Sequence, residues 1–198
     1  MDMETAGMTD VAPVLVRFAD AWKQLAHGDL LLFRRRSPIS IVGRGCHSHA
    51  AKVGFWGSEP FCLEVREWVG GRAVTLDSQV RRYPGRIDVY GTNAGDRWGN
   101  YDAHGSVAYM RRFAGCPYGY ANVLLAGCLH MPVIRLLMRP DLDDKAADKR
   151  PVFCSQAIAM AERIGGNVDV VPNLADRLTE PADLARSPFY AYRFTLMP

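Results

Sequence analysis

The sequence predicts an α+β fold in which a mostly antiparallel sheet packs against helices, and three observations support this prediction. Several short runs rich in β-branched, aromatic and other apolar residues are separated by turns that contain Gly or Pro, a pattern typical of strands and hairpins. Other segments repeat apolar residues at helical spacing and end at Gly or Pro. The chain has 198 residues, 48% hydrophobic and 23% charged, which suits one domain with its own core. We therefore predict a single domain over residues 1–198.

The first third of the chain is predicted to contain one helix and then several strands. Apolar residues recur at helical spacing over residues 13–26, and a His-Gly pair follows, so residues 1–28 are predicted to be an N-terminal helical segment. Residues 29–34 predict a buried strand, and residues 37–45 a loop. Residues 50–56 and 61–69 predict two strands joined by a hairpin turn at 57–60. Residues 73–76 and 86–90 predict two more strands, with a polar stretch between them.

The rest of the chain is predicted to be mainly helical. Residues 106–114 and 120–129 predict two helices separated by Gly115 and Pro117. Residues 141–150 are highly charged and predict a surface loop, and residues 155–164 predict a helix that ends at two glycines. Residues 190–196 alternate in polarity and predict a closing strand.

Composition argues against several classes of function. The chain has 24 Lys and Arg against 21 Asp and Glu, and a net charge of +3 is too small to indicate a nucleic-acid partner. The acidic N-terminus does not resemble a secretory signal peptide. The longest apolar run, residues 123–138, contains His, Pro and Arg and is too short for a membrane span. We therefore expect no integral membrane segment and a protein that is cytoplasmic or associated with a virion.

The five cysteines predict neither a disulfide framework nor a metal centre. Their number is odd and their spacing irregular, and Cys62, Cys116 and Cys128 lie among apolar or small residues, where a thiol is usually packed. Cys46, His47, His49 and Cys62 could in principle form a zinc site, because thiolate and imidazole are the usual ligands of zinc. Their spacing matches no standard ligand pair, because Cys46 would point away from the two histidines along an extended segment. We expect no metal and no other cofactor.

Cys154 is the strongest candidate for chemistry. It lies where a helix is predicted to begin, and about a hundred residues earlier His49 lies at the start of a predicted strand. The partial positive charge of a helix start favours a thiolate, and an imidazolium nearby favours it further. The alternative is that Cys154 is a core cysteine on an amphipathic helix and His49 a polar residue at a strand end.

Cys154 and His49 also belong to a series of seven short motifs that spans nearly the whole chain. In order these are residues 28–33 (GDLLLF), 48–51 (SHAA), 63–65 (LEV), 85–90 (GRIDVY), 115–120 (GCPYGY), 153–156 (FCSQ) and 181–188 (PADLARSP). This order resembles the circularly permuted branch of the NlpC/P60 papain-like superfamily, the YiiX/LRAT-like branch, in which the histidine precedes the cysteine. The resemblance implies an antiparallel sheet or partial barrel packed against helices.

The resemblance also implies roles for individual residues. Cys154 would be the nucleophile, His49 the base, and Glu64 the residue that orients the imidazole. A tight hairpin turning at residues 58–59 would place Glu64 opposite Val53, too far along the strand from His49, so Glu67 is the alternative third residue. Both glutamates would otherwise lie on a solvated strand face.

Three further residues are predicted to bind substrate. Tyr118 and Tyr120 precede a predicted helix and resemble the family's aromatic motif near the cleft, where they would shape a groove or donate a hydrogen bond to an oxyanion. The alternative is that they anchor the helix to the sheet. Gln156, two residues after Cys154, is assigned to the same group.

The function implied by the resemblance is acyl transfer through a thiol. The leading prediction is a cysteine amidase or endopeptidase that acts on peptide or amide bonds such as those of peptidoglycan, with residues 141–150 as a lid beside Cys154. One alternative is a lipid-directed thiol acyltransferase or esterase, for which residues 123–138 would supply apolar surface. Another is a non-catalytic module of a larger assembly such as a virion.

Overall fold

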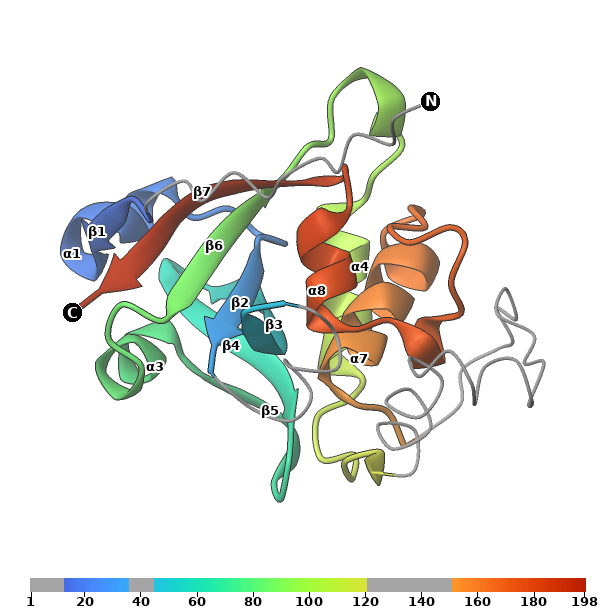
Figure 1. Cartoon of the computed structure of the whole chain (residues 1–198), viewed down its shortest axis with the longest axis horizontal. Coiled ribbons are helices and arrows are strands. Elements are labelled where there is room, and N and C mark those ends of the chain that lie inside the picture. The colour runs from blue at the N-terminus through green and yellow to red at the C-terminus, as the bar shows by residue number, and fades with distance from the viewer. Residues whose placement is uncertain (1–12, 36–44, 121–150) are drawn as a thin grey trace, which may run out of the picture.

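The computed structural model describes residues 13–35, 45–120 and 151–198 (Figure 1). Within them the strands form one open mixed sheet in the order β1-β7-β6-β2-β3-β4-β5. Its strands are β1 (Leu15–Arg17), β2 (Leu30–Arg34), β3 (His47–Trp56), β4 (Glu59–Arg66), β5 (Gly70–Thr75), β6 (Ile87–Thr92) and β7 (Tyr190–Met197). Every neighbouring pair is antiparallel except β1 and β7. The predicted α+β class and mostly antiparallel sheet are therefore confirmed, and β1 and β5 remain separate edges of an unclosed sheet.

Helices cover both faces of the sheet. The α-helices are α1 (Phe18–Ala21), α3 (Leu76–Arg82), α4 (Ala103–Arg111), α7 (Cys154–Met160) and α8 (Pro181–Arg186). The 3₁₀ turns are η1 (Trp22–Gln24), η2 (Asp96–Trp98) and η4 (Asp176–Leu178), and the π-helical segment η3 (Ala161–Gly165) continues α7. Figure 1 shows α4, α7 and α8 grouped on one side of the sheet, with α3 and α1 set apart from them. Alternate residues of β2 enter two apolar clusters: Leu30 and Leu32 contribute to the one that includes α7, whereas Leu31 and Phe33 contribute to the one that includes α3. This alternation buries both faces of the central strand.

The predicted N-terminal helix over residues 13–26 is largely wrong. Its first turn is instead strand β1, which pairs with β7 through Leu15 and Thr195, and only two short helical turns follow. The apolar residues of this segment, two of which are valines, suit an edge strand as well as a helix. The strand forms because its backbone groups pair with those of β7, which would otherwise be an unpaired edge.

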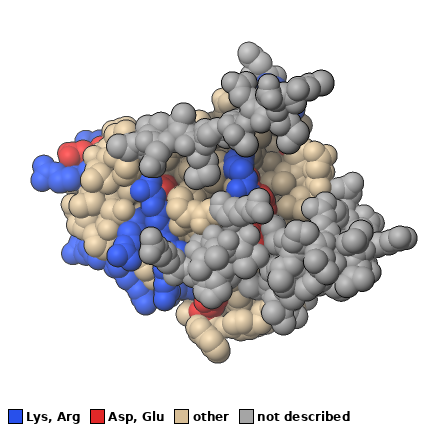
Figure 2. Space-filling view, viewed as in Figure 1, with Lys and Arg blue, Asp and Glu red and all other residues tan. Residues whose placement is uncertain are grey.

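Helix α3 was missed because the segment after β5 is polar. Leu76, Gln79 and Val80 form its buried face, while Asp77 and Arg81 form an exposed ion pair one turn apart. Figure 2, in the same view as Figure 1, shows Lys and Arg side chains gathered over α1 and α3, with few acidic side chains in view. On the side of the molecule seen there, the positive charge is therefore unevenly distributed.

Several predictions fall outside the described residues. These are most of the helix at 120–129, the apolar run at 123–138, Cys128 and the charged loop at 141–150 with its role as a lid. Among the helices that are described, we find none with the length and apolar character needed to span a bilayer.

Candidate active site

Cys154 is the first residue of α7, as the sequence predicts. Phe153 precedes it in an extended conformation, and its carbonyl accepts the N–H of Ala157. An isolated parallel bridge between Val152 and Tyr118 fixes the segment that enters the helix. Cys154 is 4% exposed, so the thiol lies below the surface of the protein.

His49 on β3 and Glu64 on β4 are hydrogen-bonded to each other, with 2.6 Å between Nε2 and Oε2. The predicted register of this hairpin is wrong by two residues. Trp56 pairs with Glu59, so the turn consists of Gly57 and Ser58, and Gly57 has a φ of 59° that glycine adopts easily. Glu64 consequently lies opposite Ala51, which is within diagonal reach of His49.

Glu67, the alternative third residue, lies beyond the end of β4 and is exposed. Glu64 in contrast is 1% exposed, and its other oxygen accepts two hydrogen bonds from Arg72, at 2.8 and 2.6 Å. Arg66 adds a longer ion pair of 3.5 Å. The geometry therefore brings Glu64 and not Glu67 to His49. Neither arginine was predicted from the sequence, although Arg72 faces Glu64 across the β4–β5 pair as an opposite charge.

The thiol meets the sheet at the point where β3 and β4 separate. Val53 exchanges backbone hydrogen bonds with the chain that leads into β2, so Ala50, three residues earlier, directs its N–H toward β4. The β3–β4 ladder ends at the pair of Ala51 and Glu64, and the N–H of Ala50 bonds to the side chain of Cys154 instead. The open end of the ladder therefore receives the sulfur and places it beside His49.

The charges of the three side chains reinforce one another. Burial opposes a charge on His49, but hydrogen bonds to Cys154 and Glu64 outweigh it and raise the pKa of His49 to about 10. Burial likewise opposes the thiolate, yet the His49 hydrogen bond and charge, with the N–H groups of Ala50 and Ser155, lower the pKa of Cys154. Against the effect of burial, His49 and the two arginines lower the pKa of Glu64 to about 2. Because Glu64 occupies Nε2, Nδ1 is the ring nitrogen left for the thiol, and a thiolate–imidazolium pair is favoured.

The two tyrosines lie next to each other beside the thiol. Tyr118 is 8% exposed and its hydroxyl is hydrogen-bonded to Cys154; burial and the charge of Cys154 raise its pKa far above the ordinary value, so it keeps its proton. Tyr120 is 45% exposed, with its ring 4.9 Å from that of Tyr118. Gln156 is buried within α7 at 2% exposure.

Trp68 is an aromatic residue near the site that was not predicted from the sequence. It is 88% exposed in the turn between β4 and β5, and its backbone N–H donates a hydrogen bond to the Tyr120 hydroxyl at 2.7 Å. The two rings lie 5.3 Å apart. Trp68 also has a φ of 65°, which is uncommon outside glycine, so the turn holds this ring outward at some cost in backbone strain.

The four residues of the possible zinc site do not come together as one set, although Cys46 Sγ lies 3.7 Å from Nδ1 of His47 and so does not point away from it as predicted. His49 contacts Phe33, whereas His47 is bonded to Asp88, and Cys62 is buried between the strands with its pKa raised by burial. Across the described ranges, no group of three or more His, Cys, Asp and Glu side chains is arranged to hold a metal ion. Cys62 is packed as predicted, and Cys116 is half-buried.

Comparisons with known proteins give a likeness of fold. No family model matches the sequence, and no curated protein matches it. Among solved structures, the crystal structure of the metalloprotein YiiX from Escherichia coli O157:H7 matches with a TM-score of 0.60 and 13% identity, over 88% of this chain and 99% of that one. At this identity the match shows a shared α+β fold over most of the chain.

Proposed function

We propose that this protein is a thiol-dependent acyl hydrolase of the permuted papain-like kind, with Cys154 as nucleophile, His49 as base and Glu64 as the residue that orients His49. The observation that carries the proposal is the series thiol, imidazole and carboxylate, in which the pKa of the thiol is lowered and that of the imidazole raised. A packed structural cysteine has no need of such partners, and burial alone would raise its pKa.

In the proposed reaction the Cys154 thiolate attacks the carbonyl carbon of the substrate and forms a tetrahedral oxyanion. The His49 imidazolium then donates its proton to the leaving amine as the bond between carbon and nitrogen breaks, which leaves a thioester on Cys154. Water, deprotonated by neutral His49, attacks the thioester and releases the acid and the thiolate. The Tyr118 hydroxyl and the backbone N–H of Cys154 are the proposed donors to the oxyanion.

The proposed substrates are amide bonds, with peptidoglycan peptides as the leading class. The family resemblance suggests this class, and the neighbouring rings of Trp68 and Tyr120 support it. Both rings are exposed, and flat aromatic surfaces of this kind suit stacking on sugar rings or peptide planes. The apolar segment invoked for a lipid substrate lies outside the described residues, so nothing in the described part of the chain favours lipid over amide.

The structural neighbour YiiX is described as a metalloprotein, but the described residues of this chain do not fit a metal centre. Cys46, His47 and Asp88 are the nearest approach to a ligand set. The Asp88 carboxylate already accepts from Arg34 at 2.6 Å and Thr195 at 2.5 Å, and the guanidinium would repel a cation there. The proposed steps accordingly use side chains and a backbone N–H of this protein together with water.

The test is alkylation by iodoacetamide across pH, with each cysteine followed separately by peptide mass spectrometry. We expect Cys154 to react well below the ordinary thiol pKa of about 8.5, and to lose this reactivity in His49→Ala. His47→Ala is the matched control, because His47 lies on the same strand but binds Asp88 instead. An unreactive Cys154, or equal reactivity in His49→Ala, would overturn the proposal.

The substrate class is tested by hydrolysis of peptidoglycan fragments beside short-chain lipid esters, with Cys154→Ser as the inactive reference. We expect release of free amines from the peptide fragments by the wild type alone. Cleavage of the esters with no release from the fragments would replace the amide assignment by the lipid one.

A further inference from the structure

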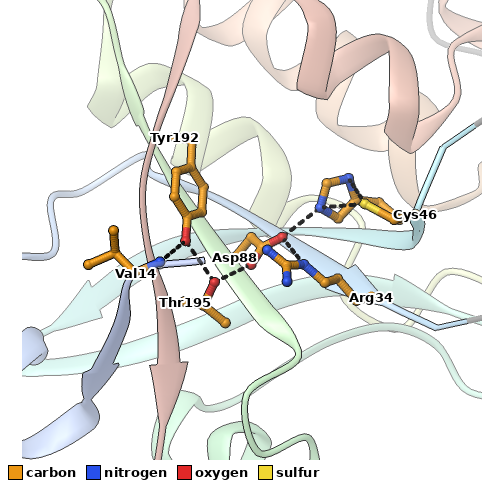
Figure 3. Close-up of polar contacts among 7 residues, drawn as sticks. Val14, Arg34, Cys46, Asp88, Tyr192 and Thr195 are labelled. Carbon is orange, nitrogen blue, oxygen red and sulfur yellow. Dashed lines mark hydrogen bonds and ion pairs between the residues drawn. The ribbon is translucent and has the colours of Figure 1, made fainter. Parts of the chain in front are cut away.

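Cys46, His47 and Asp88 form a second set of thiol, imidazole and carboxylate groups (Figure 3). The Cys46 sulfur is 3.7 Å from Nδ1 and 3.8 Å from Nε2 of His47. His47 Nε2 is 2.7 Å from Oδ2 of Asp88, which also accepts from Arg34. The other Asp88 oxygen accepts from Thr195, whose hydroxyl is hydrogen-bonded to Tyr192, as Figure 3 shows. The order of groups is therefore the same as in Cys154, His49 and Glu64.

A β-bulge keeps the two sets apart. The register between β2 and β3 shifts so that Phe33 pairs with His49 and Arg34 with His47, which leaves one extra residue on β3. Adjacent residues of β2 point to opposite faces, so the two histidines do so as well. The ring contact of His49 with Phe33 and the bond of His47 to Asp88, which pairs with Leu32, agree with this arrangement.

The charges around Cys46 favour its thiolate. Burial opposes a charge on His47, but Asp88 and Cys46 raise the pKa of His47 to about 9, so the imidazole is charged at neutral pH. The His47 imidazolium and the Arg34 guanidinium both contact the Asp88 carboxylate. These two positive charges outnumber the one negative charge, so the net charge near the Cys46 sulfur is positive. The hydrogen bond to His47, opposed in part by burial and by Asp88, lowers the pKa of Cys46, with help from the charges of His47 and Arg34.

Two phenols also lie near this set of residues in the described part of the chain. Tyr90 lies edge-on to His47, and burial raises its pKa to about 12, so it stays neutral. Tyr192 is held by its hydrogen bonds to Thr195 and to the backbone N–H of Val14. The charged groups that face Cys46 from the neighbouring strands are therefore Arg34, His47 and Asp88.

Exposure separates Cys46 from the other described cysteines. Cys46 is exposed, whereas Cys62 and Cys154 are buried and Cys116 is half-buried. Cys46 precedes a strand and not a helix, so it lacks the N–H groups that a helix start offers an oxyanion. An exposed thiolate held by a fixed imidazolium, without such donors, suits attack on a small electrophile rather than acyl transfer.

We propose that Cys46 is a second activated thiol, at which peroxides modify the protein independently of Cys154. The thiolate sulfur attacks one oxygen of hydrogen peroxide, a bond between sulfur and oxygen forms, and the bond between the two oxygens breaks. The sulfur loses two electrons and becomes a sulfenic acid, while the departing hydroxide takes the proton of the His47 imidazolium and leaves as water. Reduction by a low-molecular-weight thiol returns Cys46 to its starting state.

The test treats the full-length protein with limiting hydrogen peroxide in the presence of a 1,3-diketone that traps sulfenic acids, and maps each labelled cysteine by mass spectrometry. We expect Cys46 to be labelled at least about tenfold faster than Cys116, with the pH midpoint of its rate below the ordinary thiol value of about 8.5. Labelling of Cys116 alone, or a Cys46 midpoint at or above that value, would overturn the proposal.

The variants give a reciprocal design. His47→Gln removes the imidazolium, so we expect it to slow Cys46 at neutral pH and to move its midpoint upward, whereas His49→Ala should leave Cys46 unchanged. If His47→Gln does not fold, Arg34→Gln, whose side chain is 32% exposed, tests the same positive charge. Equal Cys46 rates in the wild type and the folded variant would refute the charge argument. Since Cys154 depends on His49 and Cys46 on His47, either proposal can fail without the other.

Discussion

Replacement of Glu64 by Gln tests whether the carboxylate next to His49 supports catalysis by its charge. The amide keeps the size of the side chain and one oxygen to accept from His49, but it removes the negative charge. Burial would raise the pKa of this carboxyl above its ordinary 4.5, yet His49, Arg66 and Arg72 bring it to about 2. That difference corresponds to about 3 kcal/mol in favour of the charged form.

The expected loss follows from how this free energy is shared. If the whole free energy were lost from the transition state, kcat/KM would fall by about 300-fold. Only the part that comes from the interaction of Glu64 with His49 affects catalysis. His49 provides the largest favourable share, so we expect kcat/KM to fall by about 10- to 100-fold. The pKa of His49 should fall below its wild-type value of about 10, and the basic limb of the pH profile should move down with it.

The assay is kcat/KM against pH on an amide substrate, together with the pH profile of Cys154 alkylation. Glu67→Gln is the control, because Glu67 is exposed beyond the end of β4 and the same change in charge should alter kcat/KM by less than about twofold. If Glu64→Gln behaves like this control, the carboxylate does not act through His49, and the proposed third role is wrong.

Three other predictions concern the pH profile, a buried ion pair and the exposed tryptophan. In the proposed mechanism the active thiolate–imidazolium pair exists above the lowered pKa of Cys154 and below the pKa of about 10 of His49. We therefore expect kcat/KM to be flat through neutral pH and to fall near pH 10. A maximum confined to pH 8–9 would contradict the lowered thiol pKa. Lys52, fully buried, pairs with buried Glu162, so Lys52→Met should lower the free energy of unfolding by about 3–5 kcal/mol in urea titrations, and a loss under about 1 kcal/mol would refute a stabilising role for this ion pair. Trp68→Gly removes an exposed ring from a residue with a φ of 65°, so it should raise KM while changing the free energy of unfolding by less than about 1 kcal/mol; an unchanged KM would remove Trp68 from the substrate surface.

Local features of the sequence predicted the positions of the main candidates well. Cys154 begins a helix and His49 lies on a strand, because apolar spacing and helix start signals are encoded nearby in the chain. The role of each residue remains a proposal. The third partner was harder to predict, since the choice between Glu64 and Glu67 depends on which two residues form the hairpin turn. The positive φ of Gly57 decides that register, and a shift of two residues along the strand changes which glutamate reaches His49.

The larger errors concern elements that are stabilised by distant partners. Strand β1 depends on β7, which lies about 180 residues later in the chain, so the helical spacing of residues 13–26 was misleading. The second thiol set was missed for the same reason. Cys46 and His47 are neighbours in sequence, but Asp88 comes from a different strand, and nothing local in the sequence indicates the bulge that turns His47 toward it.

The open end of the β3–β4 ladder has a consequence for the newly synthesised chain. The hairpin that carries His49 and Glu64 is made about a hundred residues before Cys154, and β7, which lies between β1 and β6 in the sheet, is made after both. Contacts between such distant segments form late in folding. Until α7 docks at the open ladder, Cys154 keeps the ordinary reactivity of a free thiol. The lowered pKa of the Cys154 thiol is therefore acquired only when α7 docks, and alkylation of Cys154 near pH 6 reports how much of a preparation is native.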